Sequence, residues 1–496
     1  MNLATAFARA AHRDLNKTAL YWGGERYSFG QLLDQSARVA AYLLTRGVKP
    51  GDRVGLWLKN CPEFIPALFG ILHAGAVAVP INNFLKAAEV EYILADAEAK
   101  VLITDVSLGK DLPVLTAALP GLQGLEIESI LAAAGGLEPA PLPDTPEGSL
   151  AVIIYTSGTT GRPKGAMLSH GNLLHNVESC RLVLECVDQD RMAVLLPMFH
   201  SFMLCVGVFL PLLMGGSIVL IRSLHHTLTE VCQNGATILP AIPQFFRSLI
   251  NTPKEVVLPL RMCISGAAPL PVQTLTEFGR RFSFPLIEGY GLSEASPVVT
   301  KNPLNGPRKA GSIGRPIPNV EVSIQDDAGA FLPTGGIGEL CVRGGNVMMG
   351  YWKQPAETAK AMRGDWLLTG DIGYCDADGF LFITDRKKDM LLVNGINVYP
   401  RELEEIIYHF PGVKEAAVIG VPDAKKGEQP LAFVVPNDGV VLDESAILQH
   451  LRARLADYKL PRRVVFMTAL PRNATGKVLK TALRQLAGSS GDIAAQ

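Results

Sequence analysis

Residues 155–165 read YTSGTTGRPKG and continue the apolar segment LAVIIY (150–155). They contain three glycines, four Ser or Thr hydroxyls and two cations. Glycine lets the backbone approach an anion, hydroxyls donate hydrogen bonds to its oxygens, and Lys164 can neutralise its charge. A Walker A loop needs Gly-Lys followed by Ser or Thr, whereas Lys164 lies between Pro163 and Gly165. The stretch predicts a polyphosphate-binding loop after a buried strand, and a surface turn rich in Ser, Thr and Gly is the alternative.

The segments around this loop alternate between short β-branched runs and amphipathic stretches. In FGQLLDQSARVAAYLLTRG (29–47) the apolar residues recur every three or four positions, the spacing of an amphipathic helix. Strands that alternate with helices are typical of parallel sheets flanked by helices, so an α/β fold with parallel or mixed sheets is expected. The strand-like runs are RVGLWL (53–58), AVAVPI (76–81), KVLITD (100–105), GSIVLI (216–221) and RMCISG (261–266).

The sequence changes character after about Asn302. Gly- and Pro-rich turns separate VEVSIQDDAGAFL, GELCVRG and GFLFITD, which predicts a smaller and more antiparallel β subdomain. At DRKKD (385–389) a second unit begins, with a helix in RELEEIIYHF, strands in EAAVIGVP and LAFVVP, a helix in ESAILQHLRARLA and a strand in RVVFM. We therefore expect a large N-terminal domain at 1–386 and a small α+β domain at 387–496.

Length and composition narrow the class of protein. A chain of 496 residues exceeds the usual size of a single core. A net charge of −1 gives no electrostatic basis for binding nucleic acid. The eight cysteines form no CxxC or zinc spacing, which is typical of a reducing compartment, and the N-terminus lacks the apolar core of a signal peptide. Residues 192–221 contain no charged residue, but Pro197, His200, Pro211 and Gly215-Gly216 favour a buried helix and strand over a membrane span.

The loop YTSGTTGRPKG resembles the signature of the adenylate-forming enzymes, the superfamily of acyl-CoA synthetases, luciferases and peptide-synthetase adenylation domains. The other motifs of that superfamily follow in order along essentially the whole chain. The resemblance implies that the loop and two later turns bind ATP, with Tyr290 stacking on the adenine. The implied nucleotide-binding residues are Thr156, Ser157, Gly158, Thr159, Thr160, Gly161 and Lys164 of the loop, Gly266, Ala267 and Ala268 of the first turn, and Glu288, Gly289, Tyr290, Gly291 and Ser293 of the second.

The resemblance also implies roles for several single side chains. Glu294, together with Thr156, matches the group that holds Mg²⁺ against the phosphates, a role suited to oxygen ligands. Asp371 matches the carboxylate that accepts hydrogen bonds from the ribose hydroxyls. Arg386 matches an arginine that contacts ribose or phosphate, and a hinge salt bridge is its structural alternative.

Lys477, in PRNATGK (471–477), matches the lysine that bridges the attacking carboxylate and the α-phosphate, so the resemblance makes it the catalytic residue. A preorganised donor of this kind lowers the activation free energy by about 3–4 kcal/mol. His200, in PMFHSF, matches a position that lines the acyl pocket and gates the thiol tunnel, although a core histidine is the alternative. The small domain is expected to rotate about Lys388, which brings the loop around Gly395 to the site for the second half-reaction.

The expected function is an ATP-dependent ligation of a carboxylic acid to coenzyme A through an acyl-adenylate, with ATP, Mg²⁺ and coenzyme A required. EGYGLSEASPVV and DRKKDMLLVNGINVYPRELE look most like bacterial medium- to long-chain fatty acyl-CoA synthetases. An aryl- or short branched-acid CoA ligase of the same superfamily is the first alternative, and a non-ligating adenylate-binding protein is the alternative from another class. We expect a cytoplasmic protein with at most peripheral membrane contact. The sequence does not determine the oligomeric state, so a homodimer stays an option.

Overall fold

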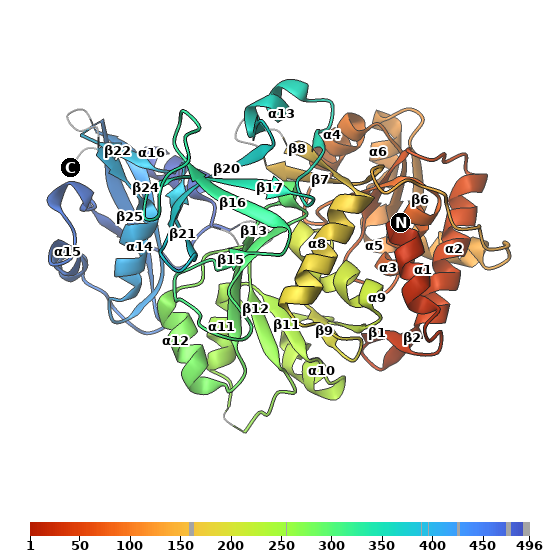
Figure 1. Cartoon of the computed structure of the whole chain (residues 1–496), viewed down its shortest axis with the longest axis horizontal. Coiled ribbons are helices and arrows are strands. Elements are labelled where there is room, and N and C mark those ends of the chain that lie inside the picture. The colour runs from red at the N-terminus through yellow and green to blue at the C-terminus, as the bar shows by residue number, and fades with distance from the viewer. Residues whose placement is uncertain are drawn as a thin grey trace.

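The computed structural model describes residues 1–157, 163–253, 255–387, 389–394, 396–423, 427–472 and 478–489. The N-terminal elements, red to yellow in Figure 1, lie at one end of an elongated molecule, and the C-terminal elements, in blue, lie at the other. The green and teal elements between them connect the two ends. The fold is a large N-terminal domain of sheets and helices followed by a smaller α+β domain.

One sheet carries the strand that precedes the predicted phosphate loop. Its core strands pair in parallel, and β8 returns antiparallel to β7 directly after the loop. Residues 151–154 of β7 are buried, as expected of a strand covered on both faces. The order is β18 (Gly350–Tyr351), β8 (Pro163–Ser169), β7 (Leu150–Ser157), β4 (Val77–Pro80), β3 (Arg53–Trp57), β5 (Ala99–Thr104) and β6 (Gln123–Glu126).

A longer mixed sheet lies beside it and contributes the two turns expected to bind adenine. Its central strands are parallel, and β14 and β15 add antiparallel strands at one edge. The order is β15 (Arg315–Pro316), β14 (Val298–Lys301), β13 (Leu286–Gly291), β12 (Met262–Ser265), β11 (Ile238–Ala241), β9 (Arg191–Val194), β10 (Ser217–Leu220), β1 (Thr18–Trp22) and β2 (Glu25–Ser28).

Helix α8 (His170–Val183) joins the two sheets, because it packs against β7 and β8 of one and β14 of the other. Its buried Asn176 donates from Nδ2 to the Val298 carbonyl at 2.7 Å and accepts from the Val298 amide at 3.1 Å. This paired hydrogen bond fixes the start of β14 against the helix. The carboxyl ends of β7, β12 and β13 therefore meet around one region, the usual place for a ligand in an open α/β sheet.

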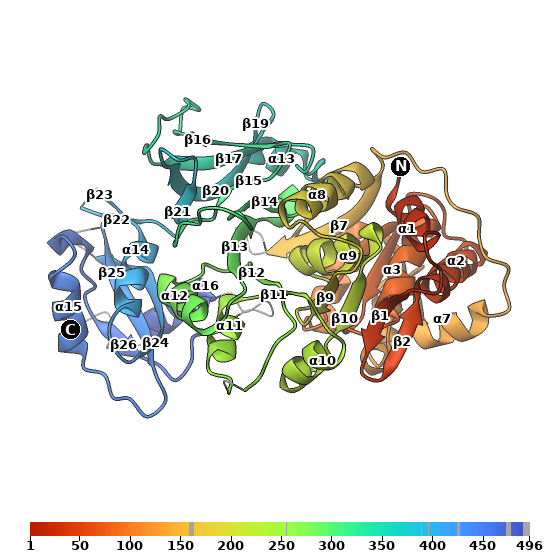
Figure 2. The same cartoon turned by 60° about the horizontal axis from the view of Figure 1, so that its bottom comes forward.

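The remaining two sheets are mainly antiparallel, and the sequence after Asn302 predicts this for the first of them. Figure 2 shows the β16–β17–β20 sheet on the same side of the molecule as α8, apart from the C-terminal sheet. The first comprises β16 (Val320–Gln325), β17 (Gly338–Gly344), β20 (Trp366–Cys375), β19 (Met362–Arg363) and β21 (Leu381–Arg386). The second comprises β23 (Ile396–Val398), β22 (Leu391–Val393), β25 (Gly427–Pro436), β24 (Val413–Asp423) and β26 (Val464–Phe466).

The helices cover the sheets and form the outer surface of both domains. In α2 the buried positions repeat with helical spacing, and Ser28 caps its start by accepting from the Gln31 amide. The helices are α1 (Leu3–Ala11), α2 (Phe29–Thr45), α3 (Phe64–His73), α4 (Ala87–Ala97), α5 (Val106–Gly109), α6 (Leu112–Ala118), α7 (Ile127–Ala134), α9 (Leu210–Met214), α10 (Thr227–Gln233), α11 (Pro243–Ile250), α12 (Val272–Arg281), α13 (Pro355–Ala361), α14 (Pro400–Tyr408), α15 (Glu444–Arg452) and α16 (Lys480–Ser489), with short 3₁₀ turns at Leu224–His226, Ser293–Ala295 and Asp457–Lys459.

The uncharged run at 192–221 is wound into a π-helical segment (Met203–Phe209), α9 and β10, all largely buried. This agrees with the predicted buried helix and strand. In the part of the chain that the structure describes, no helix has the length and apolar character needed to cross a bilayer.

Candidate active site

Two adjoining cavities open where the sheets meet. The larger has a volume of about 900 Å³ and is lined by the ends of β7, β12 and β13 and by residues 199–202. The smaller, about 280 Å³, lies between the large domain and the C-terminal domain. The residues that line both are Ala267, Gly289, Tyr290, Gly291, Asp371 and Arg386. Because the two cavities share these walls, an elongated ligand could occupy both.

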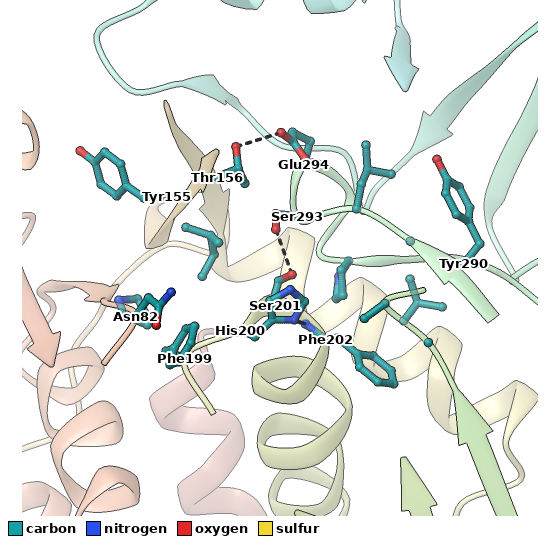
Figure 3. Close-up of a pocket in the computed structure, with 18 of the residues that line it drawn as sticks. Asn82, Tyr155, Thr156, Phe199, His200, Ser201, Phe202, Tyr290, Ser293 and Glu294 are labelled. Atoms are coloured by element: carbon teal, nitrogen blue, oxygen red, sulfur yellow. Dashed lines mark hydrogen bonds between the residues drawn. The ribbon is translucent and has the colours of Figure 1, made fainter. Parts of the chain in front are cut away.

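Glu294 and Thr156 lie side by side on the wall of the larger cavity, as Figure 3 shows. The Thr156 hydroxyl donates to Glu294 Oε1 at 3.4 Å, and the Tyr351 phenol donates to the same oxygen at 3.0 Å. The backbone carbonyl of Glu294 accepts from the Met348 amide at 2.8 Å, which fixes the turn. The structure thus brings together the two residues expected to hold Mg²⁺.

Lys164 does not point at these groups. Its ammonium forms an ion pair with Glu357 of α13 and lies 5.4 Å from the centre of the Tyr351 ring. It is absent from the described residues that line either cavity. Ser157 ends β7, while Gly158, Thr159, Thr160 and Gly161 lie outside the described residues.

Tyr290, Asp371 and Arg386 form one hydrogen-bonded group between the cavities. The Tyr290 phenol donates to Asp371 Oδ2 at 2.5 Å, and Arg386 Nε lies 3.2 Å from Asp371 Oδ1. Burial, and then the Asp371 carboxylate, raise the pKa of Tyr290, and the same carboxylate raises the pKa of Arg386. Three residues expected to contact the nucleotide are therefore in direct contact. Arg386 does form a salt bridge, but its partner Asp371 lies on the neighbouring strand β20 of the same sheet.

The turn after β12 lies against this group. Gly266 lines the larger cavity, Ala268 the smaller, and Ala267 both. Ala267 has φ of +65°, a left-handed conformation that costs a residue with a side chain about 1 kcal/mol or more. The turn is therefore held in a strained shape at the junction of the cavities.

Glu288 is fully buried and lines the smaller cavity only. Its Oε1 accepts from the Leu270 amide at 3.0 Å, whereas Oε2 has no hydrogen-bond partner among the described residues. Burial raises the pKa of this carboxyl to about 7. Glu288 thus offers an unused acceptor beside Tyr290.

His200 lies on the wall of the larger cavity, next to Phe199 and Phe202 (Figure 3). Its Nδ1 accepts from the Phe202 amide at 3.3 Å, and burial lowers its pKa to about 4, so the imidazole is neutral at pH 7. The neighbouring Ser201 hydroxyl shares a 3.0 Å hydrogen bond with Ser293, which ties the histidine segment to the turn that bears Glu294.

The C-terminal domain closes the smaller cavity. Val478 and Lys480 line the smaller cavity and Leu479 lines the larger. Lys477, the predicted catalytic residue, lies outside the described residues, as do Lys388 and Gly395. Val478, the residue that follows Lys477, nevertheless lines the smaller cavity.

Residues 7–352 match the sequence model of the AMP-binding enzyme family, and residues 402–477 match that of the AMP-binding enzyme C-terminal domain. The chain belongs to the AMP-binding enzyme family. This is the superfamily of adenylate-forming acyl-CoA ligases, and it confirms the resemblance found in the sequence.

Relatives of this AMP-binding enzyme match over nearly its full length. A long-chain-fatty-acid–CoA ligase of Bacillus subtilis is 34% identical over 97% of this chain and 94% of its own. A feruloyl-CoA synthase of Amycolatopsis is 36% identical over 97% and 98%. The ATP-bound structure of MatB from Rhodopseudomonas palustris superposes with a TM-score of 0.93 at 35% identity, over 98% of this chain and 99% of that one. These relatives establish the class of enzyme and leave the acid open.

Adenylate-forming CoA ligases use ATP, Mg²⁺ and coenzyme A. The residues of this AMP-binding enzyme fit a magnesium ion, because a carboxylate and a hydroxyl present hard oxygen ligands on one cavity wall. Within the described ranges no cluster of three or more His, Cys, Asp or Glu could hold a metal by itself. The ion would therefore take its other ligands from the substrate phosphates and water.

Two residues that line the site of this AMP-binding enzyme were not predicted from the sequence. Tyr351 holds Glu294 but comes from a two-residue strand outside every motif. Lys301 lines the larger cavity at the end of the apolar run SPVVTK (296–301). Its signal in the sequence was a single charge at the end of an apolar strand, which more often marks an exposed strand end.

Proposed function

We propose that the protein is an ATP-dependent carboxylic acid–CoA ligase that works through an acyl-adenylate. The observation that carries the proposal is the pair of joined cavities. Glu294 and Thr156 line one, Glu288 lines the other, and Asp371, Arg386 and Tyr290 line their shared wall. This arrangement suits a nucleotide whose base occupies the smaller cavity, whose ribose meets Asp371, and whose phosphates extend toward Glu294.

Each side chain then has a chemical task. The unpartnered Glu288 Oε2 would accept from the exocyclic amine of adenine, and Tyr290 would pack on the ring. Asp371 would accept from the ribose hydroxyls. Glu294 and Thr156 would hold Mg²⁺, which when bound offsets the phosphate charge. The acid carboxylate attacks the α-phosphate and pyrophosphate leaves, and the thiol of coenzyme A then displaces AMP.

The repulsion between carboxylate and phosphate requires a cation, and we assign that task to Lys477. In support, Val478 lines the smaller cavity and Leu479 lines the larger. Lys164 and the loop at 156–161 would contact the β- and γ-phosphates, which requires Lys164 to exchange Glu357 for the nucleotide.

We further propose a domain boundary at 386/387, since β21 pairs with β20 of the large domain and β22 pairs with β25 of the small one. Rotation about Lys388 would exchange Lys477 for the loop around Gly395 between the two half-reactions. The reaction would take place in the cytoplasm, where the eight free cysteines of the structure stay reduced.

For the acid, we propose a medium- or long-chain fatty acid. The larger cavity continues past His200 along apolar walls, and each buried CH₂ contributes about 0.8 kcal/mol. The walls are formed by Leu184, Phe199, Phe202, Val206, Ile264 and Val298. An aryl acid is the second candidate, because Phe199 and Phe202 also offer flat surfaces to a ring and a feruloyl-CoA synthase is among the relatives.

A screen of acids with ATP, Mg²⁺ and coenzyme A tests both levels of the proposal. Acid-dependent release of pyrophosphate with formation of a thioester is the expected result. kcat/KM should rise with saturated chain length and then level off beyond about six carbons, as methylenes fill the cavity. If benzoate or cinnamate exceeds every fatty acid from C6 to C16, the aryl-acid assignment replaces the fatty acid. Hydrolysis of ATP that is independent of any acid would refute the ligase.

A further inference from the structure

Lys301 is a buried lysine on the wall of the larger cavity. It is the last residue of β14, and only 6% of its surface is exposed. Its backbone pairs with Gly289, whose missing side chain leaves space beside the lysine stem. Val298, at the other end of β14, pairs with Gly291, next to the turn that bears Glu294. Three residues of strand place Lys301 roughly 10 Å farther from that turn.

The ammonium of Lys301 has few partners. Nζ donates to the carbonyl of Val183 at 3.2 Å, at the C-terminal end of α8, where a positive charge is favourable. No carboxylate forms an ion pair with it among the described residues. Arg261, which is close enough to disfavour the charge, is paired with Asp190, and Glu185 is the nearby acid that favours it. An ammonium has three donors, so two remain available.

Burial lowers the pKa of Lys301 to about 7. The thiols of Cys180 and Cys186 lie near enough to influence it, and burial keeps the pKa of Cys186 raised to about 12, so that thiol stays neutral. An ammonium in this environment loses most of its hydration without gaining a counter-charge. The free-energy cost of burying this ammonium would fall if a ligand supplied a hydrogen-bond acceptor.

We propose that Lys301 is a specificity-determining residue that binds an oxygen acceptor at the distal end of the acyl group, opposite to the carboxylate that is activated. The preferred substrate is then an acid with an apolar body and a terminal carboxylate or hydroxyl. This rests on the proposed ligase function, and it holds for an aliphatic or an aromatic body. A plain methyl terminus would leave the ammonium buried without a partner, which hydrocarbon contacts only partly offset.

Matched acids test the inference in the wild-type enzyme and in Lys301→Met, which keeps the length and removes the charge. The aliphatic pair is octanoate and octanedioate, and the aromatic pair is cinnamate and 4-hydroxycinnamate. In the wild type we expect the oxygenated member of at least one pair to have the higher kcat/KM, by about tenfold or more if the acceptor is charged. In Lys301→Met that preference should reverse, while the plain acid is used as well as before or better.

A purely structural role for Lys301, as a cap on α8, would lower kcat/KM for both members of a pair equally and leave their ratio unchanged. That result, or a wild type that prefers the plain member of both pairs, would overturn the inference. Lys17→Met is the matched control, because Lys17 also donates to a backbone carbonyl, that of Asp188, but is only partly buried and lines neither cavity.

A second measurement needs no variant. Since kcat/KM reports the free enzyme, the preference of the wild type for the oxygenated acid of the pair that shows one should fade as pH rises from 6 to 9 and Lys301 loses its proton. A ratio that is flat across this range would contradict the assignment to Lys301. Acid-dependent pyrophosphate release in the same assays reports separately on the ligase function.

Discussion

Glu288 is a buried acid whose ionised form destabilises the native state. The pKa rises from 4.5 unfolded to about 7 folded because of burial. The native state therefore binds the extra proton between these values, so this group lowers stability as pH rises from 4.5 to 7. Glu288→Gln should remove the effect. The Tm of the variant should equal that of the wild type at pH 4.5 and exceed it at pH 8. The corresponding gain in the free energy of unfolding at pH 8 is about 3 kcal/mol at most.

Thermal unfolding followed at several pH values measures this difference. Glu128→Gln, at an exposed position on α7, is the control for the loss of a carboxylate, and it should not raise the Tm above that of the wild type at pH 8. A Glu288→Gln difference that does not change with pH would mean that Glu288 is not the group that titrates.

Glu294 is expected to act on the triphosphate and not on adenosine. Glu294→Ala should lower adenylation by about 100-fold or more, since the Mg²⁺ ligand and its charge are lost. The affinity for AMP, which needs no metal, should change by less than about twofold because Asp371 and Tyr290 are untouched. Equal loss of AMP binding, measured by calorimetry, would make Glu294 a structural residue. Tyr351→Phe is the control, since it removes one donor to Glu294 and leaves the carboxylate in place.

Single residues were predictable only where they belong to a motif. Glu294, Asp371 and Tyr290 sit in recognisable strings, and the structure brings them to the cavities. Tyr351 reaches the same cavity because β18 pairs with β8, a strand far away in sequence. Lys301 reaches it through the register in which β14 pairs with the preceding strand β13. No local pattern records such pairing. The partnership of Lys164 with Glu357, nearly two hundred residues away, was hidden for the same reason.

At the scale of elements, α13 acts on the phosphate loop through one carboxylate. Glu357 pairs with both Lys164 of β8 and Lys360 of α13, and these cations lower its pKa to about 2. The ion pair therefore persists at neutral pH and competes with ATP for Lys164. Glu357→Gln should lower the KM for ATP by about two- to fivefold, an effect that weakens as salt is added.

Initial rates at varied ATP measure this change. Lys360→Gln is the matched control, because it removes the other partner of Glu357 and leaves Lys164 paired. A KM for ATP that is unchanged or higher in Glu357→Gln would show that Lys164 does not bind the nucleotide.

Most elements follow from local pattern. The runs at 53–58, 76–81 and 100–105 became β3, β4 and β5, and the amphipathic stretch at 29–47 became α2. Their periodicity is set by burial on one or both faces, which the sequence records directly. The π-helical winding of 203–209 was not predictable, since it depends on the packing of neighbouring helices around an apolar run.

For the whole molecule, the predicted division of labour between domains is tested by Lys477→Ala. The variant should lose acid-dependent pyrophosphate release because no cation then lies between carboxylate and α-phosphate. It should still convert supplied acyl-AMP and coenzyme A to thioester at a rate near that of wild type. Comparable loss in both half-reactions would refute the assignment.

The two-domain plan was predictable because the pattern of strands changes along the sequence, and β21 pairs with β20 whereas β22 pairs with β25. The contact between the domains was not. Arg247 of α11 donates to the carbonyl of Lys414 and to Asn437 Oδ1, and the Asp385 carboxylate accepts from the Arg401 amide. Such contacts depend on how the two folded domains dock, and no residue pattern within either domain predicts them.

The same interface binds protons. Burial between the domains raises the pKa of Asp385 to about 6 and also raises that of Glu405. Protons bound to these two carboxyls therefore stabilise the docked arrangement of the domains, and raising the pH removes that stabilisation. In the rotation proposed above, each undocking would release protons to solvent, so an increase in pH should favour thioester formation over adenylation. The ratio of the thioester-forming rate to the adenylation rate, measured from pH 6 to 8, should rise with pH, and a ratio that is flat or falls would contradict this coupling.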